Sequence, residues 1–287
     1  MKFVKEYWVP TTLMAVLLGF SAYLQLEMFW SPMVIDAEFW QKKLEFHMSC
    51  GPFAIRYFQN YTTLAVSHLF GICTRDAFYG VQFFLALLLG PVFYKYLRKI
   101  DFNRVWSNIG VILLATAYPI LGAHFAPTHT WDDFWSYHFL LFALLAAVDR
   151  RILFVGVFFT LGLLAREQII LFYPILLMLL WWSRHKIGSL KLFSTLILPI
   201  VVFVAFRIVV FEDIDPRRWE LYAFNFGNVC RTTDTLVSTI IAFGFMWMAS
   251  VIGLVELRKE SMQDYGRLLF WGGITATALT TAVTLLF

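Results

Sequence analysis

Charged residues are scarce in this chain of 287 residues, since only 15% are Asp, Glu, Lys or Arg. A soluble domain carries roughly a quarter charged residues, because its surface faces water. Hydrophobic residues make up 60% and aromatic residues 19%, with 31 Phe and 11 Trp. This balance excludes an ordinary soluble domain and predicts a helical protein that crosses a membrane several times.

Cysteines are few, and the common short catalytic motifs are missing. Cys50, Cys73 and Cys230 have no spacing that suits a metal site. Gly-rich phosphate loops and the CxxC, HExxH and GxSxG patterns are absent. No soluble catalytic family is indicated. The net charge of +4 does not require nucleic acid as a partner, because basic cytoplasmic loops give the same sign.

Long apolar runs predict an all-α fold, a multi-pass bundle of about nine transmembrane helices. Several runs approach the roughly 20 residues that cross a bilayer as a helix. Two of the predicted helices, 134–148 and 152–165, are short for a full span. The predicted helices cover residues 9–29, 76–97, 106–124, 134–148, 152–165, 168–183, 190–211, 235–256 and 268–287.

The segment 30–75 lies between the first two predicted spans and mixes charged with apolar residues at near-helical spacing. Its apolar piece from Leu64 to Cys73 is too short to cross a bilayer. We therefore predict amphipathic helices at the outer surface of the membrane, with a short membrane hairpin as the alternative.

The distribution of Lys and Arg predicts the orientation of the chain. With the N-terminus inside, fourteen basic residues fall in inner loops and seven in outer loops, which is a positive-inside bias. The N-terminus is then cytoplasmic and the C-terminus external. The inner residues are Lys2, Lys5, Lys95, Arg98, Lys99, Arg104, Arg150, Arg151, Arg184, Lys186, Lys191, Arg258, Lys259 and Arg267; the outer ones are Lys42, Lys43, Arg56, Arg75, Arg217, Arg218 and Arg231.

Two charged residues, Arg166 and Glu167, interrupt the apolar stretch "LGLLAREQIILFYP". In this scheme they form the outer turn between the fifth and sixth helices. An ionised pair in hydrocarbon costs several kcal/mol unless it is partnered or reaches water. Carboxylates of several outer loops fall in the same layer. They are Asp36, Glu38, Asp132, Asp133, Glu212, Asp213 and Asp215. Such charges can also be solvated helix ends, and Arg166 with Glu167 can be an ion pair that pins two helices.

The order of these parts resembles the GT-C superfamily of integral-membrane glycosyltransferases, in particular the protein mannosyltransferase and aminoarabinose transferase branch. The similar stretches are "VIDAEFWQKKL" with Asp36, "GPFAIRYF" with Arg56, "ATAYPILGAHFAPTHTWDDFWSYHFLL", and "LGLLAREQIILFYPILLML" with Arg166 and Glu167. The resemblance covers roughly residues 9–185. It implies a conserved membrane module over 1–185. The sequence departs from the family after this module, since residues 186–287 are predicted as membrane helices with no soluble domain.

The resemblance implies transfer of a sugar from a polyprenyl-phosphate donor to a glycan, lipid or protein acceptor at the outer face. Asp36 and Asp133 are the candidate catalytic carboxylates, and Asp36 is the candidate base. Arg56 and Arg166 suit the lipid phosphate, because a guanidinium makes paired, charge-assisted hydrogen bonds. Glu167 can orient Arg166 or a sugar hydroxyl.

Three further residues of the outer layer complete the candidate site. His129 and Trp131 can line the sugar site, and Asp132 is a further substrate-binding candidate. A divalent cation bound by Asp36 and Asp133 is the possible cofactor.

We favour a bacterial inner membrane over the endoplasmic reticulum. The alternative is a non-catalytic membrane protein, either a lipid-linked sugar flippase or transporter, or a subunit that only binds polyprenyl phosphate. A transporter is expected to show repeated halves and ionisable groups at the bilayer midplane, and neither is evident in the sequence.

Overall fold

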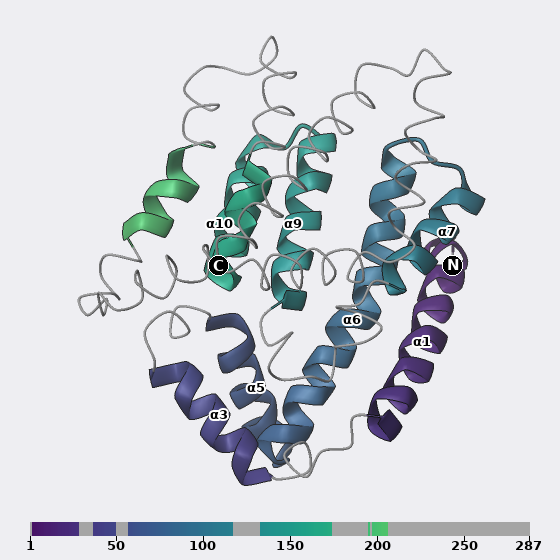
Figure 1. The fold of residues 1–287 in the computed structure, drawn as a ribbon. Coiled ribbons are helices and arrows are strands. Elements are labelled where there is room, and N and C mark those ends of the chain that lie inside the picture. The colour runs from purple at the N-terminus through teal and green to yellow at the C-terminus, as the bar shows by residue number, and fades with distance from the viewer. Residues whose placement is uncertain are drawn as a thin grey trace, which may run out of the picture.

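The computed structural model describes residues 2–28, 37–49, 57–116, 133–173, 195 and 197–205. Within these residues the regular secondary structure is helical and contains no strand, so the all-α prediction is confirmed for this part of the chain (Figure 1). The helices are α1 (Lys2–Met28), α3 (Ala37–Ser49), α5 (Tyr57–Phe70), α6 (Thr74–Lys99), α7 (Arg104–Ala115), α9 (Asp133–Val148), α10 (Ile152–Ala165) and the 3-10 helix η1 (Glu167–Phe172).

Helix α6 lies at the centre and contacts α1, α3, α5, α7 and α9. It runs antiparallel to α1, because Tyr7 near the start of α1 meets Tyr94 near the end of α6 with ring centroids 5.9 Å apart. The two helices approach closely at Gly90. A Cβ added there would lie 3.0 Å from the Cβ of Met14, so the missing side chain permits this contact.

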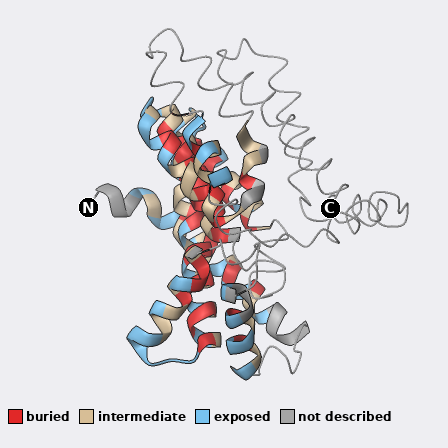
Figure 2. Cartoon of the chain, turned by 90° about the vertical axis from the view of Figure 1, so that its left-hand side faces the viewer, coloured by how far each residue is buried: buried red, intermediate tan, exposed pale blue. Residues whose placement is uncertain are grey.

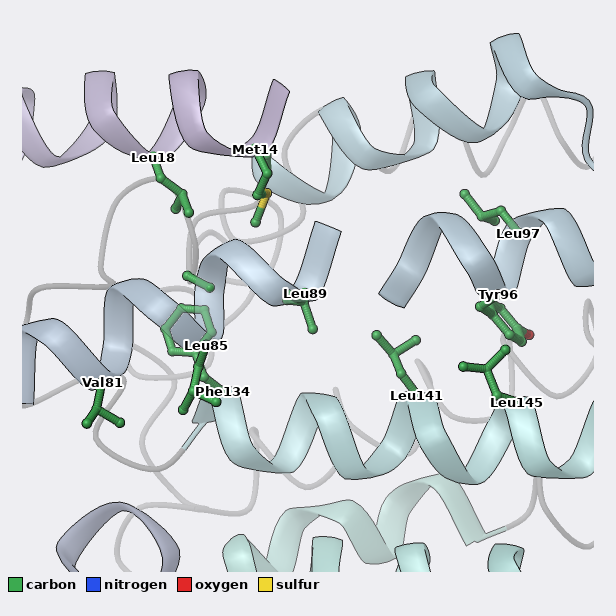
Figure 3. Packing of buried hydrophobic residues seen from close by; sticks show 12 residues of the cluster. Met14, Leu18, Val81, Leu85, Leu89, Tyr96, Leu97, Phe134, Leu141 and Leu145 are labelled. Atoms are coloured by element: carbon green, nitrogen blue, oxygen red, sulfur yellow. The ribbon is translucent and has the colours of Figure 1, made fainter. Parts of the chain in front are cut away.

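The main core lies between α1, α6 and α9 and consists of aliphatic and aromatic side chains, among them Met14, Leu85 and Phe134 (Figure 3). Helix α9 runs parallel to α6, and both end at the same level, where Lys99 Nζ lies 2.6 Å from Asp149 Oδ1. Buried residues follow the inner faces of the helices, whereas exposed residues occupy their outward faces and both ends (Figure 2).

Helices α9 and α10 form an antiparallel hairpin. Phe142 meets Phe158 at 5.3 Å between ring centroids. A Cβ at Gly162 would lie 3.5 Å from the Cβ of Phe139. The turn between the helices contains Arg150 with φ 59°, a left-handed conformation that most residues avoid.

Several residues of the predicted inner loops gather at one end of the bundle, which we call the basic end. The Lys99–Asp149 pair joins the last turn of α6 to the turn before α10, and α7 begins close by after the capping residue Asn103, whose side chain accepts from the backbone N–H of Trp106. The basic end consists of Lys95, Arg98, Lys99, Arg104, Arg150 and Arg151.

The observed helices agree with most predicted ranges in this part of the chain. The predicted helix 152–165 coincides with α10, 134–148 lies within α9, and 76–97 lies within α6. Helix α1 begins at Lys2 rather than residue 9, because its charged first turns continue the helix beyond the apolar run.

Two predicted helices differ from the structure. The third, 106–124, is observed as α7 up to Ala115, and residues 117–124 lie outside the described residues. The sixth, 168–183, begins as the 3-10 helix η1 instead of an α-helix, and residues 174–183 are outside the description.

One described helix, Thr74–Lys99, has the length and apolar composition that a membrane span requires. Shorter apolar helices are Arg104–Ala115, Phe134–Val148 and Ile152–Ala165. Helix α5 has 14 residues, which corresponds to about 21 Å. It covers most of the predicted apolar piece and, as predicted, is too short to cross a bilayer about 30 Å thick.

Candidate functional site

Arg166 lies at a break in the backbone between α10 and η1. Its φ of −156° and ψ of 123° are extended, so it stops the α-helix. The backbone is still fully bonded: the N–H of Arg166 donates to Gly162 O at 2.8 Å, and its carbonyl accepts from the N–H of Ile169 at 3.1 Å. The residue is half-buried. Local hydrogen bonds therefore hold the backbone of Arg166 in a defined position.

The chain reverses direction at this break. Ile169 packs back against Gly162, where an added Cβ would lie 3.3 Å from Ile169 Cγ2. Tyr173 continues the return and meets Phe159 with ring centroids 5.9 Å apart. Arg166 thus sits at the apex of a turn between two antiparallel segments, as the sequence predicted. The predicted α-helical start at this point is wrong, because a 3-10 helix tightens the turn.

The backbone of Asp133 begins α9 at the same end of the bundle as Arg166. Helices α9 and α10 have 16 and 14 residues, are antiparallel, and are joined by a short turn, so their open ends lie at nearly the same level. Glu167 follows Arg166 as the first residue of η1. The side chains of Asp133 and Glu167 lie outside the description. The fold brings together three of the predicted site positions, separated by up to 34 residues in sequence.

This end of the α9–α10 hairpin lies part of the way along α6 (Figure 1). Because α6 and α9 run parallel and are aligned by Lys99 and Asp149, the start of α9 at Asp133 is level with Phe83 of α6. Helix α6 extends beyond that level by about nine residues, or about 14 Å. The first turns of α6, together with α3 and α5, project past the end of the α9–α10 hairpin (Figure 1).

Aromatic rings connect α5 to α9 at this level. Phe58 in the first turn of α5 has its ring centroid 5.7 Å from that of Trp135 and 4.8 Å from that of Phe139. Trp135 and Phe139 stack on each other at 5.8 Å. Gln59 follows Phe58 and is buried, and His138 precedes Phe139 and is buried as well. None of these residues was a sequence candidate for the site.

The sequence contained one signal for this group. His138 falls inside an apolar run, which favours a histidine hydrogen-bonded within the bundle, and its Nδ1 does lie 2.8 Å from Phe134 O. Among the residues that the structure describes, the second ring nitrogen has no hydrogen-bond partner, which the sequence alone does not reveal.

The other predicted site residues lie outside the described residues: Asp36, Arg56, His129, Trp131 and Asp132. The possible divalent cation between Asp36 and Asp133 therefore stays a prediction. Across the described ranges, no group of three His, Cys, Asp or Glu side chains is close enough to hold a metal ion.

Comparison of the chain with models of protein families, with curated proteins and with solved structures finds no match.

Proposed function

We propose that the chain is a multi-pass membrane protein that transfers a sugar from a polyprenyl-phosphate donor to an acceptor at the face of the membrane opposite the basic end. The membrane assignment is supported by the apolar composition and by α6. It is also supported by apolar side chains that face outward from the bundle. Val16, Phe20 and Tyr23 of α1 are 64%, 58% and 61% exposed, and Leu153 of α10 is 73% exposed. Large apolar side chains exposed on the outside of a bundle match lipid better than water.

The observation that carries the proposal is the common level of Arg166 and the start of α9. A helix of 14 residues measures about 21 Å, about 9 Å less than the hydrocarbon layer. With the basic end at the cytoplasmic surface, Arg166 therefore lies below the outer boundary of a full-thickness bilayer. A guanidinium at this depth needs anionic or polar partners. The guanidinium has five N–H donors, so it can donate to a lipid phosphate and to a protein partner at the same time.

The proposed reaction uses the predicted carboxylate base. An acceptor hydroxyl oxygen attacks the anomeric carbon of the sugar, and the bond from that carbon to the phosphate oxygen breaks. The hydroxyl proton passes to the carboxylate of Asp36, and the electron pair of the broken bond remains on the polyprenyl phosphate. Arg166 stabilises the charge that develops on this leaving group.

Variants of Arg166 and Asp36 test the proposal. Arg166→Lys keeps the charge but loses the planar fork, so the affinity for polyprenyl phosphate should fall by about 1–3 kcal/mol. Asp36→Asn removes the proton acceptor and should abolish turnover with donor affinity little changed. Arg151→Lys, an equivalent exchange at the basic end, is the matched control and should leave binding unchanged. Binding is measured with the purified protein and a fluorescent polyprenyl monophosphate, and turnover with the corresponding glycolipid.

The outcomes separate the alternatives. The wild-type protein could bind the lipid through Arg166 and yet transfer no sugar to any glycan, lipid or protein acceptor. This result would support a flippase, a transporter or a phosphate-binding subunit. Equal binding by the wild type, Arg166→Lys and Arg151→Lys would contradict the role of Arg166. Transfer by Asp36→Asn at the wild-type rate would exclude Asp36 as the base.

A further inference from the structure

Helix α9 ends at the basic end with the exposed residue Arg150 in the left-handed conformation, at φ 59°. Two hydrogen bonds close this turn. The N–H of Arg150 donates to Ala147 O at 3.0 Å, and that of Arg151 donates to Ala146 O at 2.8 Å. Glycine normally occupies the left-handed position of such a turn, because a Cβ is unfavourable there. An arginine at this position indicates a side chain whose role offsets that strain.

The same kind of turn ends α5 at the opposite end of the molecule, and there the left-handed residue is glycine. The N–H of Ile72 donates to Ser67 O at 3.1 Å, and Gly71 has φ 63°. At the basic end, α6 is followed by Asp101 at φ 70°. Asp adopts this conformation more readily than Arg. Both turns of the basic end therefore keep a charged residue where glycine would fit, and Arg150 is the less expected of the two.

Charges are distributed unequally between the two ends. Among the side chains that the structure describes, the six of the basic end face three acidic ones, an excess of three; the acidic residues are Glu6, Asp101 and Asp149. In α3, α5 and the first turn of α6, three basic and three acidic residues cancel: Lys42, Lys43, Arg75, Glu38, Glu45 and Asp76. An anionic surface is therefore attracted to the basic end and not to the opposite one.

Three arginines of the basic end are free to meet such a surface. Arg104, Arg150 and Arg151 are exposed and form no ion pair with any other residue in the described ranges. The ion pair between Lys99 and Asp149 holds the turn after α6 beside the turn after α9, at one end of the bundle (Figure 1). The unpaired arginines of both turns therefore belong to one surface.

Exposed apolar side chains follow these arginines within one helical turn. Trp106, two residues after Arg104, is 54% exposed. Leu153 and Phe154, which follow Arg151, are 73% and 48% exposed. Charge is thus outermost and apolar surface comes next along both helices. A lipid monolayer has the same order, headgroups and then hydrocarbon, and Trp favours the boundary between them. An acidic protein segment would match the charge but not the apolar layer.

We propose that the basic end binds the anionic headgroups of phospholipids through Arg104, Arg150 and Arg151. The arginines lie on two exposed turns, so the affinity depends on the number of positive charges and not on the planar shape of the guanidinium. This inference goes beyond the proposed function and rests only on its membrane assignment.

Arg150→Gly and Asp101→Gly test the proposal as a matched pair. Both place glycine at a left-handed position of the same end, but the first removes a positive charge and the second a negative one. The protein in uncharged detergent is titrated with fluorescent phosphatidylglycerol, which is anionic, and with fluorescent phosphatidylcholine, which is neutral overall. The ratio of the two affinities should fall about fivefold in Arg150→Gly, the contribution of one basic residue near an anionic surface. In Asp101→Gly it should stay the same or rise.

Thermal unfolding without added lipid gives a second readout. Glycine relieves the left-handed backbone, so both variants should unfold at the wild-type temperature or higher. A lower unfolding temperature of Arg150→Gly, with an unchanged affinity ratio, would give Arg150 a structural role and overturn its role in binding. Arg104→Gln, on the other turn, should lower the ratio by a similar factor, and it supplies the binding test if Arg150→Gly does not fold.

The remaining outcomes separate this inference from the proposed function. Equal wild-type affinities for the two phospholipids, or an equal fall of the ratio in Arg150→Gly and Asp101→Gly, would overturn it. Arg166→Lys should keep the wild-type ratio, and a loss of the preference in this variant would assign the preference to the phosphate site instead. A wild-type protein that stays in solution without detergent and does not enter lipid vesicles would overturn the membrane assignment and this inference together.

Discussion

Gly90 determines how closely α1 and α6 approach. A Cβ at this position would lie 3.0 Å from Met14 Cβ and 3.4 Å from the carbonyl oxygen of Pro10, and neither atom can swing away. Gly80, in the same helix, has open space around it. Alanine favours a helix over glycine by about 1 kcal/mol, so Gly80→Ala should stabilise the protein.

Gly90→Ala brings the same gain in helix propensity, but its added methyl group does not fit into the contact with α1. We expect it to be less stable than Gly80→Ala by about 1–3 kcal/mol. The free energies of unfolding of both variants in detergent give the comparison. Equal stabilisation by the two substitutions would show that α1 does not pack on α6 at Gly90.

At the residue scale, the sequence showed which charged residues interrupt apolar runs, but it did not show which side chains are buried. Arg166 was recognisable because a charge between two apolar runs is costly, and this cost predicted a turn at that point. Phe58 and Trp135 carry no such signal, since aromatic residues are abundant throughout this chain. Their contact forms only when α5 folds against α9, so the sequence does not predict it.

At the element scale, helix ranges were predictable where apolar runs end in charged turns. The range 152–165 is bounded by Arg151 and Arg166, and α10 has the same limits. The helical start of 168–183 was not predicted correctly, because hydrophobic periodicity does not distinguish the first turns of an α-helix from a 3-10 helix. Which helices pack against each other could not be predicted from the sequence either, because the contact that aligns α6 with α9 joins residues 50 positions apart.

The Lys99–Asp149 pair tests this alignment. Its N–O distance is 2.6 Å, and both side chains are partly exposed at the basic end. A double-mutant cycle with Lys99→Ala and Asp149→Ala should give a coupling of about 0.2–1 kcal/mol, as for other surface pairs. The coupling should weaken at 1 M salt, because the charges are screened. A coupling of zero at low salt would contradict the alignment of the two helices.

At the scale of the whole molecule, the account depends on two ends that face opposite sides of a membrane. Chemical labelling of single cysteines can test on which side each end lies, provided that the labelled residue is exposed. Ser107 and Ser136, near the starts of the predicted helices 106–124 and 134–148, are buried at 0% and 1% exposure and would not react. Cys73 is a free, exposed thiol that caps the start of α6, the part of this helix that extends beyond the level of Arg166. Arg104 is exposed at the basic end.

The most direct test is cysteine labelling with a membrane-impermeant maleimide in intact cells. It uses a background in which Cys50 and Cys230 are replaced by Ser, with either Cys73 or, after Cys73→Ser, Arg104→Cys as the single thiol. Cys73 should label in intact cells, whereas Arg104→Cys should label only after the membrane is permeabilised. Labelling of Arg104→Cys in intact cells with protection of Cys73 would reverse the orientation. Equal labelling of both thiols from the same side would contradict the claim that a membrane separates the basic end from the level of Arg166.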